Sequence, residues 1–297
     1  MRILISGGSG FLGSYLSRHF IEKNYEVSVL TRDETRAAKI LDKKVRIITD
    51  LDDGNKFDVI INLAGESLNK KNWSKDLKQK FIQSRVNATK KIVEFANKSK
   101  KKPSLLISAS AVGFYGHDYN NSFTEDSKPA DQGFCNQLCT EWENEAKNID
   151  SKIRLCIIRI GIVLAKDYGA FKEMVTPLKY GLGATLGNGM QWMSWIHITD
   201  FINAIDFLIE NKKAEGVFNL CAPEPVRQTE MAGVLASKLG RPHILRLPNF
   251  LVELIFGEMG KVLLLEGAKV EPAKLQKLSF HFHYPELDSA LNDLCSD

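Results

Sequence analysis

The first thirteen residues constrain the fold of this chain more than any other stretch. The apolar run Ile3–Ile5 precedes Gly7, Gly10 and Gly13, and an amphipathic helical pattern begins at Phe11. We interpret the stretch as a strand, a glycine turn and a helix. Gly7 permits the tight turn, Gly10 lets a pyrophosphate approach the backbone, and Gly13 lets the helix pack close to the sheet.

The amino end of this predicted helix is suited to phosphate. Unpaired N–H groups and a partial positive charge at that end attract anions. We therefore expect Phe11, Leu12 and the three glycines to bind the diphosphate of a dinucleotide. A glycine turn that holds no ligand is the alternative.

Strand and helix patterns keep alternating along the first half of the chain. Further strands are predicted at 27–30, 45–49, 58–65, 104–108 and 153–160, and a long helix is predicted at 74–98. This rhythm is typical of βαβ units and indicates an α/β protein with a doubly wound parallel sheet of the Rossmann type.

The pattern loosens after residue 160. Four glycines between 181 and 189 indicate a loop, and Thr199 is a suitable N-cap for a following helix. We predict a Rossmann domain over residues 1–160, to which 190–220 return. The rest, 161–189 and 221–297, is expected to form a smaller mixed α/β substrate lobe.

The composition is that of an ordinary globular protein. Apolar residues make up 44% and charged residues 26%, and the net charge is only +4. Because lysines stand beside acids in most segments, we expect a small-molecule substrate and no nucleic-acid partner. No apolar run is long enough to span a membrane, so no membrane partner is expected.

The five cysteines indicate a reducing compartment. They are odd in number and lack the paired spacing of a metal site, so we predict free thiols and no metal. Cys135 and Cys139 are expected to be buried as small hydrophobic side chains, and a two-thiolate metal site formed by this pair is the alternative. Since the chain starts directly with the predicted strand and glycine turn, we expect no signal peptide and a cytoplasmic location.

The end of the second predicted strand bears on the choice of cofactor. Thr31 and Arg32 follow Leu30, and no acid stands at the strand end. An acid there would bind the ribose hydroxyls of NAD, whereas an arginine suits the 2′-phosphate of NADP. We therefore predict NADP or NADPH, with Arg32 as the phosphate ligand. A solvent-exposed Arg32 is the alternative, and the nearby Asp33 leaves NAD open.

Further cofactor contacts are expected at the carboxyl ends of the next strands. Asp50 and Leu51 follow the third strand and form a plausible wall for the adenine. Ala64 and Gly65 end the fourth strand and are expected beside the cofactor. Glu66 either faces the ligand cleft or is an ordinary loop carboxylate.

Three stretches carry a family resemblance, at 7–13, 58–65 and 108–116. They resemble the extended short-chain dehydrogenase/reductase superfamily, in its branch of nucleotide-sugar epimerases and dehydratases. A narrower similarity is to epimerase-like proteins with a C-terminal domain of unknown function, matched here at about 248–295. Its further marks are Ala64–Glu66, Ser84–Val86, Cys139 with Trp142 and Glu143, and 191–198.

The resemblance implies a reaction that needs three groups. In the superfamily a tyrosine is the general acid or base, a lysine lowers its pKa and holds the nicotinamide ribose, and a serine or threonine binds the reacting oxygen. Ser110, at the end of the fifth strand, is our candidate for the serine. Ser108 is the runner-up and a further expected cofactor contact.

The tyrosine and the lysine are missing from the helix expected at 133–143. Aligned through Trp142 and Glu143, Cys135 falls at the tyrosine position and Cys139 at the lysine position. A helix-borne cysteine without a cationic neighbour is expected to keep a near-normal pKa. The usual proton relay therefore does not transfer to this chain.

The other candidates are positional. Tyr115 and His197 are possible acids or bases, although packing or hydrogen bonding is the more frequent role of such residues. Arg85 stands where the branch often has an asparagine near the cofactor, so it either contacts the ribose or pyrophosphate or forms a surface pair. Arg159 is a candidate to bind an anionic substrate. Trp195 is a candidate to line the bottom of the substrate pocket.

These observations lead to two functional hypotheses. The first is an NADP-binding, epimerase-like oxidoreductase that moves hydride between the nicotinamide and a carbon bearing a hydroxyl. The second is a sensor or regulatory protein that responds to NADP without turnover, which the missing tyrosine and lysine favour. The substrate stays open, and we expect a monomer or a homodimer.

Overall fold

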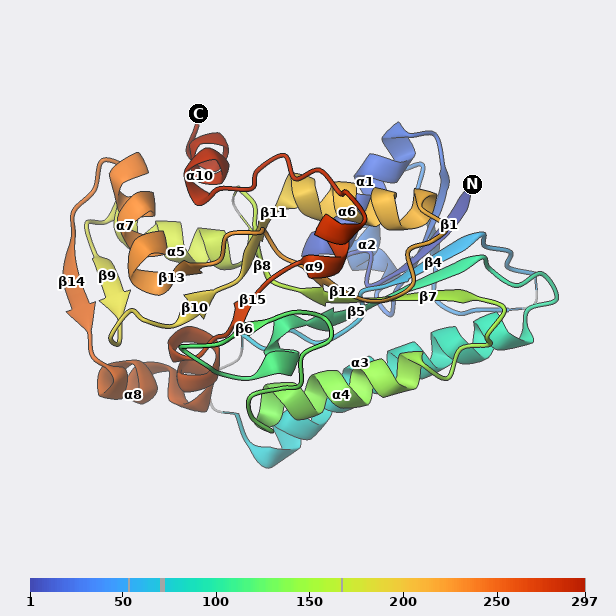
Figure 1. The fold of residues 1–297 in the computed structure, drawn as a ribbon. Coiled ribbons are helices and arrows are strands. Elements are labelled where there is room, and N and C mark those ends of the chain that lie inside the picture. Colours follow the sequence, from blue (N-terminus) through green and yellow to red (C-terminus); the bar gives the residue numbers. More distant parts are fainter. Residues whose placement is uncertain (53, 70–72, 167, 297) are drawn as a thin grey trace.

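Seven parallel strands form the central sheet of the computed structural model, which describes residues 1–52, 54–69, 73–166 and 168–296 (Figure 1). Across the sheet the strands follow the order β12-β7-β5-β4-β1-β2-β3. Their bounds are β1 Arg2–Ser6, β2 Glu26–Leu30, β3 Arg46–Ile48, β4 Val59–Asn62, β5 Leu105–Ala111, β7 Arg154–Ile160 and β12 Gly216–Leu220.

The predicted Rossmann-type sheet is confirmed. Ile3, Leu4 and Ile5 are fully buried, because helices cover both faces of a parallel sheet and leave its strands no solvated side. The chain runs outward from β1 to β3 and then returns to β4 on the other side of β1. The order therefore reverses between β1 and β4, and ligands bind at such a point in doubly wound folds.

Helices pack on both faces of this sheet (Figure 1). Helices α1 (Phe11–Glu22) and α6 (Ile198–Glu210) lie on one face, and α3 (Lys75–Lys98) and α4 (Phe134–Ala146) on the other. The first pair is joined by Asp206 of α6, which accepts hydrogen bonds at 2.6 Å from His19 and Lys23 of α1. The long predicted helix begins at its N-cap Ser74, whose hydroxyl accepts from the N–H of Leu77.

Helix α2 joins β2 to β3 and packs beside the sheet, and most of the remaining elements build the second part of the molecule and its junction with the sheet (Figure 1). A second apolar core gathers Phe171, Trp195, Leu235 and Leu291. The helices are α2 Glu34–Ile40, α5 Gly169–Lys179, α7 Gln228–Lys238, α8 Asn249–Gly260, α9 Ala273–Lys277 and α10 Leu287–Cys295, with short helices η1 Val112–Tyr115 and η2 Lys261–Leu265. The strand pairs are β6 Ser122–Phe123 with β15 Lys269–Val270, β8 Ile162–Leu164 with β11 Trp195–His197, β9 Gly183–Leu186 with β14 His243–Leu247, and β10 Trp192–Met193 with β13 Val226–Arg227.

Two expectations about this second part were wrong. The glycine-rich stretch is not only a loop, because β9 lies within it and pairs with β14. Three of the glycines, Gly181, Gly187 and Gly189, lie in the turns that flank β9 and have positive φ. Helix α6 is capped by His197 rather than Thr199, since the His197 ring accepts from the Thr199 N–H at 3.1 Å. The proposed boundaries between the two lobes stay a prediction.

No helix among the described residues is both long enough and apolar enough to cross a membrane.

The C-terminal segment is tied to α6 by one buried carboxylate, that of Asp200. It is fully buried and accepts from the backbone N–H groups of His283 at 2.7 Å and Tyr284 at 2.8 Å. Asp200→Ala would leave both donors without their acceptor, so we expect it to lower the free energy of unfolding by about 2–4 kcal/mol. Urea denaturation followed by circular dichroism measures the change.

Asp288→Ala is the control for this variant. Asp288 is exposed, and its contacts with Lys238 and Asn292 lie at the surface, so its removal should change the unfolding midpoint little. Equal effects of the two substitutions would contradict the role assigned to Asp200.

Candidate dinucleotide cleft and its buried polar network

The glycine turn after β1 is packed too tightly for side chains at two of its three glycines. Gly7 has a φ of +78°, and a Cβ there would lie 2.9 Å from the carbonyl of Leu63 at the end of β4. A Cβ on Gly13 would lie 2.5 Å from the oxygen of Gly7. These contacts hold the start of α1 against the carboxyl ends of β1 and β4.

Gly10 faces open space instead. The nearest atom to a Cβ built there is the oxygen of Gly7 at 3.2 Å, and nothing else lies within 4 Å. Gly10 is the N-cap of α1, and no side chain caps the helix. The first N–H groups of a helix have no partner within it, so this end of α1 offers free donors. A diphosphate fits this cradle by close approach at Gly10 and by hydrogen bonding to the helix.

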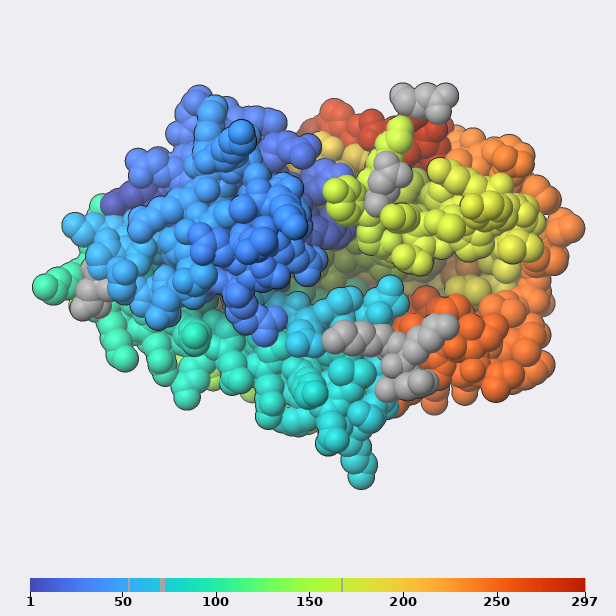
Figure 2. Space-filling view, turned by 180° about the vertical axis from the view of Figure 1, so that it is seen from behind, coloured from blue at the N-terminus to red at the C-terminus, as the bar shows by residue number. Residues whose placement is uncertain are grey.

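The surface is hollowed beside this part of the molecule (Figure 2). The blue and cyan atoms of the N-terminal part lie on one side, and the yellow-green and orange atoms of the second part lie on the other. Across the junction, Tyr168 at the start of α5 stacks on Phe11, with ring centroids 5.4 Å apart and planes within 4°. The second part therefore touches the first residue of α1, and Leu12 packs on the sheet core.

The end of β2 leaves one charged side chain free to meet a ligand. Arg32 is exposed. The carboxylate of Asp33 is occupied, because its Oδ1 accepts from the Arg36 N–H at 2.9 Å and caps α2. The sequence analysis did not predict helix α2. Asp33, the acid that kept NAD as an alternative cofactor, caps this helix.

The next strand ends supply the other predicted contacts. Leu51 follows β3 and donates its N–H to the Asp50 carboxylate at 2.9 Å. After β4, the Ala64 N–H lies 3.4 Å from the side-chain oxygen Oδ1 of Asn62, and the Glu66 N–H donates to the Ser84 hydroxyl of α3 at 3.1 Å. These residues stand at the carboxyl edge as expected, and their cofactor roles stay predictions.

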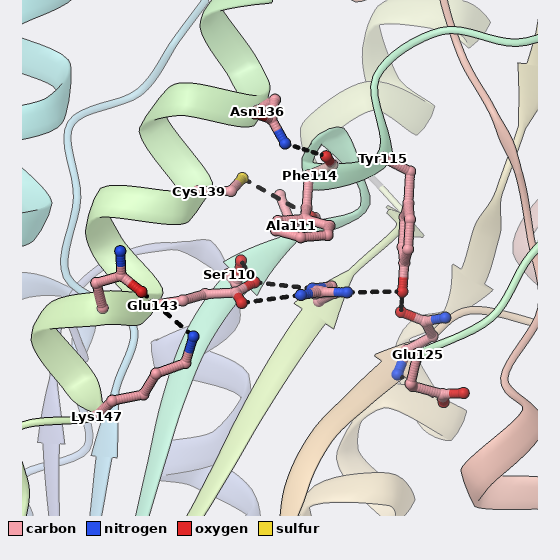
Figure 3. Close-up of polar contacts among 12 residues, drawn as sticks. Ser110, Ala111, Phe114, Tyr115, Glu125, Asn136, Cys139, Glu143 and Lys147 are labelled. Carbon is pink, nitrogen blue, oxygen red and sulfur yellow. Dashed lines mark hydrogen bonds and ion pairs between the residues drawn. The ribbon is translucent and has the colours of Figure 1, made fainter. Parts of the chain in front are cut away.

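Ser110 lies at one end of a buried hydrogen-bond network (Figure 3). Its hydroxyl donates to Oε1 of Glu143 on α4 at 2.7 Å. The guanidinium of Arg159, whose residue is paired with Ser110 across the sheet, donates to both carboxylate oxygens at 2.8 and 2.9 Å. All three residues are at most 4% exposed. Arg159 is therefore committed to Glu143 and is not free to bind an anionic substrate.

Tyr115 lies at the other end of this network. Its hydroxyl accepts from Arg159 at 2.9 Å and donates to Asn219 at 2.8 Å (Figure 3). The backbone N–H of Asn219 donates in turn to Glu125. Burial raises the pKa of Tyr115 to about 12, although Arg159 acts the other way. These contacts make Tyr115 a poor acid or base near neutral pH.

Cys135 and Cys139, which align with the tyrosine and lysine positions expected from the resemblance, have raised pKa values. Burial raises the pKa of Cys135 to about 12 and that of Cys139 to about 11. The expectation of near-normal values was wrong on two grounds. Burial of the two thiols disfavours the thiolate more than was allowed for, and a cationic neighbour is present, because Arg85 lowers both values in part.

His197, Trp195 and Ser108 are also buried. The His197 ring lies 3.2 Å from a carboxylate oxygen of Asp293, and burial lowers its pKa. Trp195 belongs to the second core, and its indole donates to the backbone oxygen of Glu224. Ser108 is fully buried, and its hydroxyl has no partner among the described residues. The catalytic and substrate roles given to these residues stay predictions.

Glu143 is the residue whose importance the sequence reasoning missed. It was used only to align the helix, yet it holds both Ser110 and Arg159. A signal was available, since Glu143 follows Trp142 and shares the buried face of α4 with Leu138 and Ala146. An acid on such a face needs a buried partner. Asn219 and Glu125 carry no comparable signal, because nothing local indicates that they are paired.

Within the described residues, no group of three or more His, Cys, Asp or Glu side chains is placed to hold a metal ion.

Comparison with known proteins identifies the family. The model of the NAD dependent epimerase/dehydratase family matches residues 3–221, and a domain of unknown function, DUF1731, matches residues 247–294. The first match covers more than half of the chain, so the chain belongs to the NAD dependent epimerase/dehydratase family.

Particular relatives are similar over nearly the whole length. An epimerase family protein of Staphylococcus aureus strain N315 is 38% identical over 301 residues, which span 99% of each chain. One of Staphylococcus haemolyticus is 36% identical over 299 residues, or 99% of this chain and 98% of that one. The crystal structure of human epimerase family protein SDR39U1 with NADPH has a TM-score of 0.91 and 28% identity, with 99% of each chain covered.

A buried ion pair that organises a site can be tested by a double-mutant cycle. Arg159→Met would leave the Glu143 carboxylate buried without its cation, and we expect a loss of about 3–5 kcal/mol in the free energy of unfolding. Adding Glu143→Gln removes the unpaired charge, so the double variant should recover part of that loss. Urea denaturation of the four proteins gives the coupling, and strictly additive losses would count against the pair.

The raised pKa values of the two thiols predict low reactivity of Cys135 and Cys139 at pH 8. At pH 8, well below about 11 to 12, Cys135 and Cys139 are almost entirely thiols, and only the thiolate reacts. We expect Cys135→Ser and Cys139→Ser to leave the fast phase of labelling by Ellman's reagent unchanged in the folded protein. Loss of one fast-reacting thiol in either variant would contradict the assignment.

Proposed function

We propose that this chain binds NADP or NADPH and transfers hydride between the nicotinamide and a carbon that bears a hydroxyl in the reduced substrate. The observation that carries the proposal is the uncapped amino end of α1, with open space at Gly10. The similar human protein SDR39U1 has been solved with NADPH, and this supports the choice of ligand.

The preference for NADP over NAD rests on the end of β2. Arg32 is exposed there, and a guanidinium matches the geometry of a phosphate. The nearest acid, Asp33, is used as the N-cap of α2 and is therefore a poor ligand for the ribose hydroxyls of NAD.

The proposed role of Ser110 follows from its hydrogen bond. Because its proton is directed to Glu143, the serine oxygen presents lone pairs, and these accept a hydrogen bond from a substrate hydroxyl. The bound nicotinamide would supply the hydride chemistry. We propose water as the proton carrier, because burial makes Tyr115, Cys135 and Cys139 hold their protons tightly.

The second candidate is a protein that binds NADP and signals its occupancy without turnover. The observation that favours it is the engaged hydroxyl of Tyr115, together with the two thiols at the tyrosine and lysine positions. In this reading the stack of Tyr168 on Phe11 would communicate the state of the cleft to the second part.

A hydride-transfer assay separates these two functions. NADPH oxidation is followed at 340 nm with a panel of aldehydes, ketones and keto-sugars, and NADP reduction with the matching alcohols. Turnover that Ser110→Ala abolishes and Ser99→Ala preserves would establish the enzyme, since Ser99 caps the far end of α3. Tight NADPH binding without turnover on any substrate would favour the sensor.

The cofactor preference has its own prediction. Arg32→Ala should weaken NADPH binding by about 1–3 kcal/mol, the scale of a charged hydrogen bond, and leave NADH binding nearly unchanged. Arg241→Ala, at an exposed position of the second part, is the matched control. Titration of NADPH fluorescence measures both affinities, and equal affinity of the unmutated protein for NADH and NADPH would refute the preference.

The remaining proposals concern the setting of this activity. We propose a small-molecule substrate, no nucleic-acid or membrane partner, a monomer or homodimer, and a cytoplasmic location. The five free cysteines support a reducing compartment.

A further inference from the structure

Arg85 on α3 lies at the carboxyl edge of the sheet. A Cβ built on Gly65, just after β4, would lie 2.9 Å from Cζ of Arg85 and 3.0 Å from its Nε. The glycine thus allows the guanidinium to lie directly against the backbone of the loop that is expected beside the cofactor. The side chain is not the surface pair that was the alternative in the sequence.

On its other side the guanidinium faces α4. Its Cζ lies 5.2 Å from the ring of Trp142. The charge also acts on Cys139 and Cys135, whose pKa values it lowers against the effect of burial. These two cysteines occupy the positions of the family's lysine and tyrosine, so the cation of Arg85 lies beside the place from which that lysine is missing.

The hydrogen bonding of Arg85 is incomplete. Nη1 donates to the backbone oxygen of Phe81 at 3.1 Å, and Nε is buried without a partner among the described residues. Burial lowers the pKa of Arg85, although Cys139, Cys135 and Glu66 act in the opposite direction.

Arg159, which is buried near the site, provides a comparison. Arg159 donates to two oxygens of Glu143 and to the hydroxyl of Tyr115. A guanidinium carries five N–H donors, and leaving buried donors unpaired is unfavourable. Arg159 therefore has the bonding of a structural ion pair, whereas Arg85 has donors left for a ligand.

We propose that Arg85 replaces the missing lysine and binds the nicotinamide ribose of the cofactor. The positive charge has moved from α4 to α3, and the small Cys139 leaves the lysine position without a second cation. The ribose hydroxyl oxygens are acceptors that match the free donors of the guanidinium. This inference rests on the proposed function, because it concerns how the same cofactor is held.

The test compares two ligands that share the adenosine and its 2′-phosphate and differ in the nicotinamide riboside. NADPH carries the nicotinamide riboside, whereas adenosine 2′,5′-bisphosphate carries only the adenosine and its 2′-phosphate. Arg85→Met should weaken NADPH binding by about ten- to a hundredfold and leave the affinity for adenosine 2′,5′-bisphosphate within about twofold. Arg32→Ala should weaken both ligands. Isothermal titration calorimetry gives the dissociation constants.

Two further variants keep the inference testable if Arg85→Met folds poorly. Arg85→Lys retains the charge and should retain part of the NADPH affinity. Cys139→Lys, added to Arg85→Met, returns the cation to α4 and should recover affinity for NADPH but not change that for adenosine 2′,5′-bisphosphate. Lys90→Met, at an exposed position on the same helix, controls for loss of charge alone.

Three results would overturn the inference. NADPH affinity unchanged in Arg85→Met would show that the guanidinium does not touch the cofactor. Equal weakening of both ligands, with no recovery by lysine at either position, would show that Arg85 only supports the fold. Failure of the unmutated protein to bind either ligand would refute the proposed function itself, and is recognised by the absence of any binding heat.

Discussion

The close approach of the glycine turn to the end of β4 is the constraint on which the candidate site depends. Gly7 lies against the carbonyl of Leu63, and Gly13 lies against Gly7, so α1 can point its amino end only at the carboxyl edge of the sheet. A Cβ on Gly10 would meet only the oxygen of Gly7, at 3.2 Å. The packing that orients the helix therefore also leaves the cradle open.

Two arginines near this site, the buried Arg159 and the half-buried Arg85, differ in their hydrogen bonding. Arg159 donates to both oxygens of Glu143 and to Tyr115, and Glu143 in turn accepts the Ser110 proton. Arg85 keeps unpaired donors next to Gly65. The guanidinium of Arg85 faces Trp142 of α4, the helix on which the resemblance leads one to expect a tyrosine and a lysine and on which the sequence has neither.

The sequence predicted much of the fold and less of the site, for physical reasons. Buried parallel strands and glycine turns are local features, so the sheet and the start of α1 were predicted correctly. The pairing of Ser110, Glu143 and Arg159 joins positions on β5, α4 and β7, and sequence distance conceals it. The same limit affected Cys135 and Cys139, because their pKa values depend on burial and on a charge from α3.

The central claim is that a dinucleotide places its diphosphate at the amino end of α1. Crystals of the protein grown or soaked with saturating NADP test it most directly. We expect density for the diphosphate at Gly10, with the 2′-phosphate beside Arg32. An empty cleft in such crystals, or a dinucleotide bound away from α1, would contradict the account.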